Sequence, residues 1–150
     1  MKQRSLITFF FLLFSFITLA QKKTVKTPDQ SKNKEEIIEL LNSKYDYYQT
    51  KALQIWDYAE VGYKEEKSSA LLQQALKENG FTVESGVAGI PTAFVASYGS
   101  GSPVIGILGE FDALPGMSQQ AVPEKEPIEG KMAGHACGHH LFGVASVAAG

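Results

Sequence analysis

The feature that most constrains this chain is a dense group of residues of the types that bind metal ions. All three histidines and the single cysteine of the chain lie between positions 135 and 140, in the segment Gly134-His135-Ala136-Cys137-Gly138-His139-His140. Imidazole nitrogen and thiolate sulfur are ligands that Zn²⁺ and similar ions prefer. The glycines allow the backbone to turn sharply around a group held close to it. The fold must therefore place this segment where it can surround something.

Cys137 and His139 are the predicted metal ligands. Two ligands separated by one residue in a turn can reach a single ion, or one ion each of a close pair. For His135 and His140, ligation and a structural role both stay open. One alternative is a buried cysteine beside histidines that cap the next helix. Another is a cysteine nucleophile activated by histidine, which would also need an oxyanion hole and an orienting group that the sequence does not identify.

A pair of carboxylates follows an apolar segment in the middle of the chain. The uncharged run from Val104 to Gly109 predicts a central strand buried on both faces of a sheet. Glu110 and Asp112 come directly after it, and ligands of open α/β sheets bind beyond the carboxyl ends of strands. The alternative is that both are solvated loop acids, or that Asp112 accepts backbone hydrogen bonds in a turn at Pro115-Gly116.

The remaining pattern predicts helices on either side of a hairpin. A helix capped by Asn33 is expected to bury one stripe of residues, namely Ile37, Leu41, Tyr45, Tyr48, Ala52, Ile55 and Ala59. A second helix is predicted from Lys67 to Asn79 with Gly80 as its left-handed cap and with Leu72, Ala75 and Leu76 inward.

Two short strands are predicted next, at 81–84 and 92–98, and are expected to pair as a hairpin. A polar loop at 117–130 then leads to an uncharged, buried helix over 141–150.

The beginning of the chain has the profile of an export signal. Lys2 and Arg4 precede the apolar stretch 6–20, and small residues precede a cut after Ala20. We expect a signal peptide at 1–20, a flexible leader at 21–34, and a periplasmic or extracellular location. The alternative is a transmembrane anchor, but the stretch is shorter than the roughly 18 residues that spanning requires, so no stable membrane anchor is expected.

Composition limits the chain to a single folded domain. The 150 residues are 44% hydrophobic and 20% charged, which allows a core to form. The formal net charge of −2 lacks the basic excess that nucleic-acid binding requires. Nucleic acid is therefore excluded as a partner.

Two motifs together resemble the metal-site signature of a known family. The segments Gly109-Glu110-Phe111-Asp112-Ala113-Leu114-Pro115 and 134–140 are similar to those of the M20 metallopeptidase and amidohydrolase family. Within it they resemble subfamily D, which includes the aminobenzoyl-glutamate hydrolase B subunits and hydrolases of N-acyl amino acids. The segment Tyr58–Tyr63 resembles the exit of the family's first helix. The likeness runs from about residue 35 to Gly150 and implies an α/β fold, with 35–150 forming the N-terminal part of a zinc-peptidase-like catalytic domain that has a central mixed sheet flanked by helices.

The resemblance implies roles for matched positions alone. Cys137 and His139 match family metal ligands. Asp112 matches an acid that contacts a metal ligand, not the metal itself, and so supports that ligand. Glu110 stands where many family peptidases have a ligating histidine, so no role is transferred to it. His135 and His140 likewise receive none.

The implied reaction is hydrolysis of an amide bond by metal-activated water, with zinc or manganese as one or two divalent ions. The implied substrates are N-acyl amino acids, aminobenzoyl-glutamate-like compounds or dipeptides. The family's general-base glutamate and further ligands have no match before Gly150. We therefore expect an N-terminal fragment of a larger enzyme that forms a homo- or hetero-oligomer through a region absent here. The alternative is a non-catalytic metal-binding remnant or interaction module.

Overall fold

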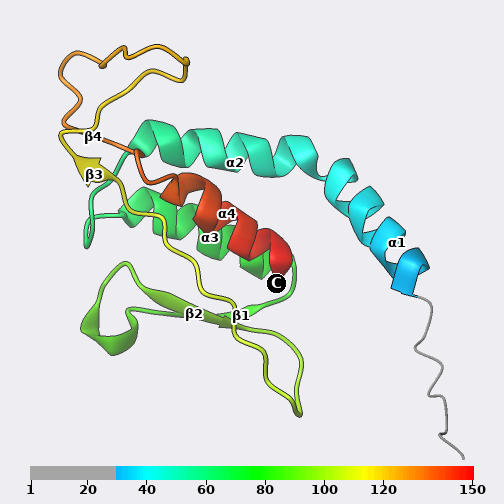
Figure 1. Cartoon of the computed structure of the whole chain (residues 1–150). Coiled ribbons are helices and arrows are strands. Elements are labelled where there is room, and N and C mark those ends of the chain that lie inside the picture. Colours follow the sequence, from blue (N-terminus) through cyan, green and yellow to red (C-terminus); the bar gives the residue numbers. More distant parts are fainter. Residues whose placement is uncertain (1–29) are drawn as a thin grey trace, which may run out of the picture.

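The structure is a computed structural model that describes residues 30–150 (Figure 1). The predicted signal peptide at 1–20 and residues 21–29 of the predicted leader lie outside the described residues. The elements in chain order are α1 (Gln30–Ser43), α2 (Tyr45–Tyr58), α3 (Glu66–Glu78), β1 (Thr82–Ser85), the 3₁₀ turn η1 (Val87–Gly89), β2 (Phe94–Ser97), β3 (Leu114–Pro115), β4 (Ala133–Gly134) and α4 (His139–Ala149). The predicted mixture of helices and strands is confirmed.

The first predicted helix is two helices, and three of the seven residues of its predicted core face are exposed. The chain bends at Lys44, next to Ser43, whose hydroxyl donates to the carbonyl of Leu40 at 2.7 Å. Such a bond competes with the helical backbone pattern and favours a break. Helix α1 begins at Gln30, ahead of the predicted cap, and projects from the body in Figure 1. The prediction of burial is wrong for three residues of the stripe, which are exposed: Ile37, Leu41 and Tyr45.

Helix α3 and the hairpin match their predictions closely. Leu72, Ala75 and Leu76 are buried, and Gly80 has the positive φ of +88° expected of a left-handed cap. Strands β1 and β2 pair antiparallel in the register Thr82 to Ser97. β3 and β4 form a second antiparallel pair, between Leu114–Pro115 and Ala133–Gly134.

The segment at 104–109 is extended but is not a strand, so this prediction is wrong. No strand of residues 30–150 pairs with it, and its side chains lie largely in solvent, with Val104 88% and Ile105 82% exposed. An apolar run predicts a buried strand only where neighbouring strands cover it. In the described chain the run instead passes along α4, where the Ser146 hydroxyl donates to the carbonyl of Leu108 at 2.7 Å.

The core lies between α2, α3 and α4. Its buried residues are Ala52, Ile55, Leu72 and Val144, with Tyr48, Leu71, Phe94, Phe111 and Val147 packed around them. The prediction of an uncharged, buried helix over 141–150 holds for one face of α4, because Leu141 and Phe142 are 58% and 40% exposed. Within residues 30–150, no helix combines the length and the hydrophobicity needed to cross a bilayer.

Candidate metal centre

Helix α4 lies directly against the segment that carries both carboxylates. A Cβ atom added to Gly143 would lie 2.9 Å from the carbonyl oxygen of Glu110 and 3.0 Å from Cβ of Phe111. Only glycine allows two backbones to approach this closely. Phe111 in turn stacks on Phe94 of β2, with ring centroids 5.9 Å apart. The residues around Glu110 are therefore fixed between α4 and the hairpin.

A second set of contacts fixes Asp112 through the residue after it. Ala113 forms a parallel bridge with Val61, and its N–H donates to the carbonyl of Glu60 at 2.7 Å. The carboxylate of Glu60 accepts hydrogen bonds from the N–H groups of Lys67 and Ser68 at 3.0 and 2.8 Å. These are N–H groups in the first turn of α3, which have no partner within the helix itself. Glu60 therefore connects the site segment to the start of α3.

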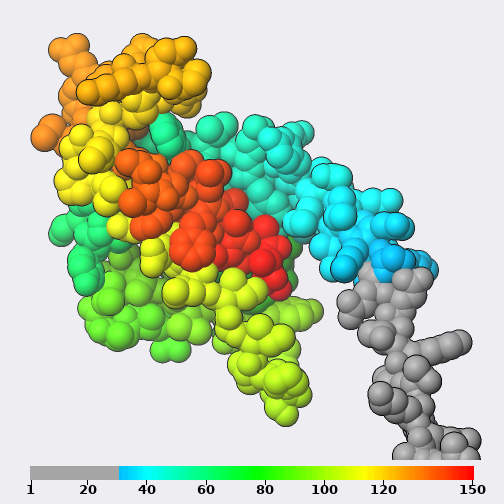
Figure 2. Space-filling view, viewed as in Figure 1, coloured from blue at the N-terminus to red at the C-terminus, as the bar shows by residue number. Residues whose placement is uncertain are grey.

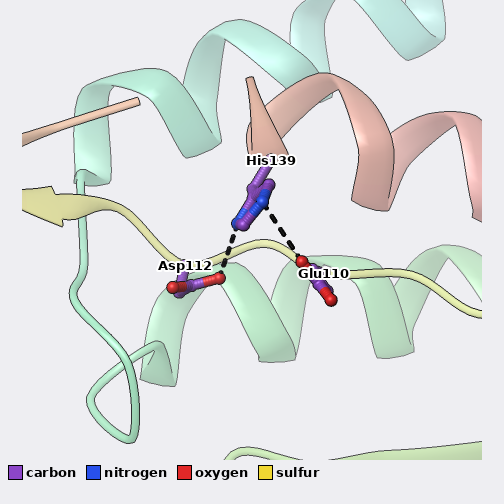
Figure 3. Close-up of side chains that lie close together, drawn as sticks. All are labelled: Glu110, Asp112 and His139. Atoms are coloured by element: carbon purple, nitrogen blue, oxygen red, sulfur yellow. Dashed lines mark hydrogen bonds and ion pairs between the residues drawn. The ribbon is translucent and has the colours of Figure 1, made fainter. Parts of the chain in front are cut away.

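His139 is the first residue of α4. Gly138 precedes it with a φ of +75°, a left-handed conformation that side chains other than glycine adopt at a cost. This turn directs the His139 ring toward the carboxylates, as Figure 3 shows. The predicted glycine turn therefore places His139 beside Glu110 and Asp112, the two acids that follow the apolar run.

The His139 ring lies between two carboxylates. Nδ1 lies 2.7 Å from Oδ1 of Asp112, and Nε2 lies 3.1 Å from Oε2 of Glu110. An ionised carboxylate only accepts hydrogen bonds, so Nδ1 carries its proton and donates to Asp112. A neutral ring would then turn the Nε2 lone pair toward the Glu110 oxygens. That geometry favours a positive charge between Nε2 and Glu110, either a second proton or a metal ion.

The donor set suits a divalent metal ion. Glu110, Asp112 and His139 each offer a ligand atom, and these atoms all lie within 4.8 Å of one another. Imidazole with carboxylate oxygen is a ligand combination of Zn²⁺ and of other transition metals. The Asp112 bond to Nδ1 is the support that ligating histidines commonly have on their second nitrogen. Side-chain exposure is 50% for Glu110 and 23% for His139, so the group is open to solvent.

Cys137 lies apart from this group. It is exposed, with a free thiol, and does not belong to the cluster that Glu110, Asp112 and His139 form. The structure therefore brings together one of the two predicted ligands with both carboxylates. Ligation by Cys137 stays a prediction.

His135 and His140 face the protein interior. The Nε2 atom of His135 donates to the carbonyl of Ile55 at 2.9 Å, and the His140 ring lies edge-on to Trp56 at 4.8 Å between centroids. Within the described residues the Nδ1 atoms of both are buried without a hydrogen-bond partner. Burial lowers the pKa of His135, and burial with the neighbouring His135 lowers the pKa of His140 to about 4. Both are therefore neutral at pH 7 and act as core residues in this structure.

Glu110 is a residue of the site to which the family resemblance transfers no role. Its place beside Asp112, after the apolar run, is a signal for a site, but many peptidases of the resembling family have a ligating histidine at that position. The alternative for Asp112 is an acceptor in the Pro115-Gly116 turn, but in the structure its carboxylate is hydrogen-bonded to His139. Gly116 donates its N–H to the carbonyl of Met132, across the β3–β4 pair.

Known proteins with similar sequences are hydrolases. The chain is 48% identical to a subunit of the p-aminobenzoyl-glutamate hydrolase of Escherichia coli (strain K12) over 97 residues, which is 64% of this chain and 20% of that protein. It is 37% identical over 87 residues to thermostable carboxypeptidase 1 of Saccharolobus solfataricus, covering 57% of this chain and 21% of that protein. It is 34% identical over 86 residues to hippurate hydrolase of Campylobacter jejuni, covering 57% and 22%. No family model matches the sequence.

The matched regions are a small part of each relative. The chain spans about a fifth of the length of these proteins. The activity of the whole protein is therefore a proposal.

Proposed function

We propose that this chain carries part of the metal site of an amide hydrolase. The resemblance to the M20 metallopeptidase and amidohydrolase family and the names of the similar proteins support this proposal. The observation that supports this proposal most strongly is the His139 ring between Asp112 and Glu110. Two carboxylates on opposite nitrogens of one imidazole form an anionic pocket suited to a cation.

Each residue of the group has its own part in this proposal. Asp112 accepts the Nδ1 proton and so sets the tautomer and the orientation of the ring. His139 then offers Nε2 as a metal ligand, and Glu110 offers a carboxylate beside it. Cys137, two residues before His139, is the further predicted ligand. A bound divalent ion, with zinc and manganese as the proposed identities, would supply Lewis-acid activation of water and of the scissile carbonyl.

The proposed substrates are N-acyl amino acids, aminobenzoyl-glutamate-like compounds or dipeptides. Two relatives are named for p-aminobenzoyl-glutamate and for hippurate, and another is named as a carboxypeptidase. Hippurate is N-benzoylglycine, so both named compounds are amides between an aromatic acid and an amino acid. We propose that a glutamate serves as the general base.

Assembly and location are part of the same proposal. One relative is named as a subunit of its hydrolase, which supports a second, partner polypeptide for the full protein. The export signal predicted at 1–20 supports a periplasmic or extracellular site of action.

The test is hydrolysis by the full gene product purified with zinc or manganese. We expect release of the free amino acid from p-aminobenzoyl-glutamate or hippurate, and a loss of at least a hundredfold in kcat/KM in His139→Ala. The control is Glu84→Gln, which removes an exposed charge on β1, outside the site. Full activity in His139→Ala would contradict the proposal. Metal binding without turnover on any of the three substrate classes would favour a non-catalytic module instead.

A further inference from the structure

A hollow lies beside the metal loop, on the side formed by the 117–130 loop. Its volume is about 460 Å³, and Ala136, between His135 and Cys137, forms part of its wall. The other lining residues that matter here are Trp56, Met117, Ile128, Met132 and Lys125. The loop stands over the C-terminal end of α2 in Figure 1 and forms a separate lobe of the surface in Figure 2.

The loop that forms this hollow is organised by its own hydrogen bonds. The Gln119 carboxamide donates to the carbonyl of Glu124 at 2.7 Å and accepts from the N–H of Glu126 at 3.0 Å. The Ser118 hydroxyl donates to the carbonyl of Ile128 at 3.0 Å and accepts from its N–H at 2.9 Å. A loop without secondary structure that is braced in this way is typical of binding loops. The hollow is therefore largely formed before a ligand arrives.

The lining has the chemistry of an aromatic binding site. Met117 and Met132 expose 50% and 80% of their surface, while Trp56 is half-buried between the hollow and the histidines. Thioether sulfur and the indole ring both make favourable contacts with aromatic rings. A cavity of about 150 Å³ already accepts benzene, so the volume here is sufficient for a benzoyl group.

The charges at this hollow favour a ligand that also carries an anion. Lys131 pairs with Asp57 at 3.1 Å. Lys125 has no ion-pair partner among residues 30–150, so its ammonium group is available at the rim. An exposed cation next to an apolar hollow attracts a ligand with an aromatic body and a carboxylate.

We propose that this hollow is the subsite for the aromatic acyl group of the substrate, with Lys125 attracting the carboxylate. The proposal rests on the proposed function, since it assumes that the ligand is an N-acyl amino acid. It adds residues that decide between acyl groups. The fluorescence of Trp56 reports whether the hollow is occupied, because Trp56 is the only tryptophan of the chain.

The experiment titrates the full chain with hippurate and with N-acetylglycine while following Trp56 fluorescence. The two ligands share the amide and the carboxylate and differ only in the acyl group. We expect hippurate to change the emission with a Kd at least tenfold lower than that of N-acetylglycine in EDTA, where neither ligand is hydrolysed. Met117→Gln and Met132→Gln should each weaken hippurate binding about fivefold. Because both methionines are exposed, these substitutions leave the core intact.

The control variant is Leu53→Gln, which makes a similar change at an exposed position of α2 outside the hollow. Equal affinity for the two ligands, or unchanged hippurate binding in both methionine variants, would overturn the subsite. If metal binding and turnover fail while the hippurate preference survives in EDTA, the proposed function is wrong and the subsite stands. If His139 binds metal but the acyl group makes no difference, the subsite alone is wrong.

Discussion

His139 presents one ring nitrogen to each of two carboxylates, and the two contacts have different consequences. The bond from Nδ1 to Asp112 orients the ring, whereas Glu110 faces the nitrogen that is left to bind a cation. We expect Asp112→Asn to retain the ring's position but to weaken zinc binding by about 10–100-fold, because a neutral amide supports the ligand less well. Competition with a chromophoric chelator measures this. Asp57→Asn is the matched control, and equal weakening in both variants would contradict a specific role for Asp112.

His140 predicts a pH dependence of stability at the same scale. Burial first, and then the nearby His135, lowers the pKa of His140 to about 4, below its ordinary value of 6.5. The unfolded chain therefore takes up this proton at a higher pH than the folded chain. Stability is fully present above pH 6.5 and falls as the pH drops toward 4, by roughly 1–2 kcal/mol after allowance for solvent screening.

Thermal unfolding followed by circular dichroism between pH 7.5 and 4.5 measures this loss. We expect His140→Phe, which keeps a ring against Trp56 and cannot be protonated, to have a shallower pH dependence. An unchanged slope in that variant would show that other groups cause the loss.

At the scale of elements, the approach of α4 to the carboxylate segment depends on Gly143. A methyl group there would lie 2.9 Å from the Glu110 carbonyl oxygen and 3.0 Å from the Phe111 Cβ, which is closer than van der Waals contact. We expect Gly143→Ala to lower the free energy of unfolding by about 1–3 kcal/mol, as overpacking does. Urea denaturation measures it. Gly106→Ala is the control, because an added Cβ meets nothing within 4 Å there, and a similar loss in both variants would contradict the close packing.

Glu60 joins two elements in a way that substitution can test. Its carboxylate accepts from the first turn of α3 and from the Ser68 hydroxyl, while its carbonyl accepts from Ala113. We expect Glu60→Ala to destabilise the chain by about 1–3 kcal/mol, since the Lys67 and Ser68 donors lose a charged acceptor. Glu84→Ala, at an exposed position of β1, provides the comparison under the same denaturant conditions. A loss no larger than in Glu84→Ala would contradict the capping role.

At the scale of the whole molecule, the sequence predicted well those features that local chemistry determines. The α3 helix with its Gly80 cap and the hairpin that follows depend on periodicity and turn residues, and both are confirmed. The run at 104–109 and the outer half of the first helix depend on what covers them, and hydrophobicity alone does not encode the partner. The site shows the same division. The motif predicted His139 and Asp112, but the placement of Glu110 opposite Nε2 follows from packing at Gly143, which no local pattern reveals.

The central claim is that His139 binds a divalent metal beside the two carboxylates. Isothermal titration of the full chain with zinc, in parallel with His139→Ala, tests this claim most directly. We expect zinc to bind the original chain, and we expect the affinity to fall at least a hundredfold in the variant while Asp57→Asn binds as before. Equal zinc affinity in the original chain and in His139→Ala would contradict the metal site.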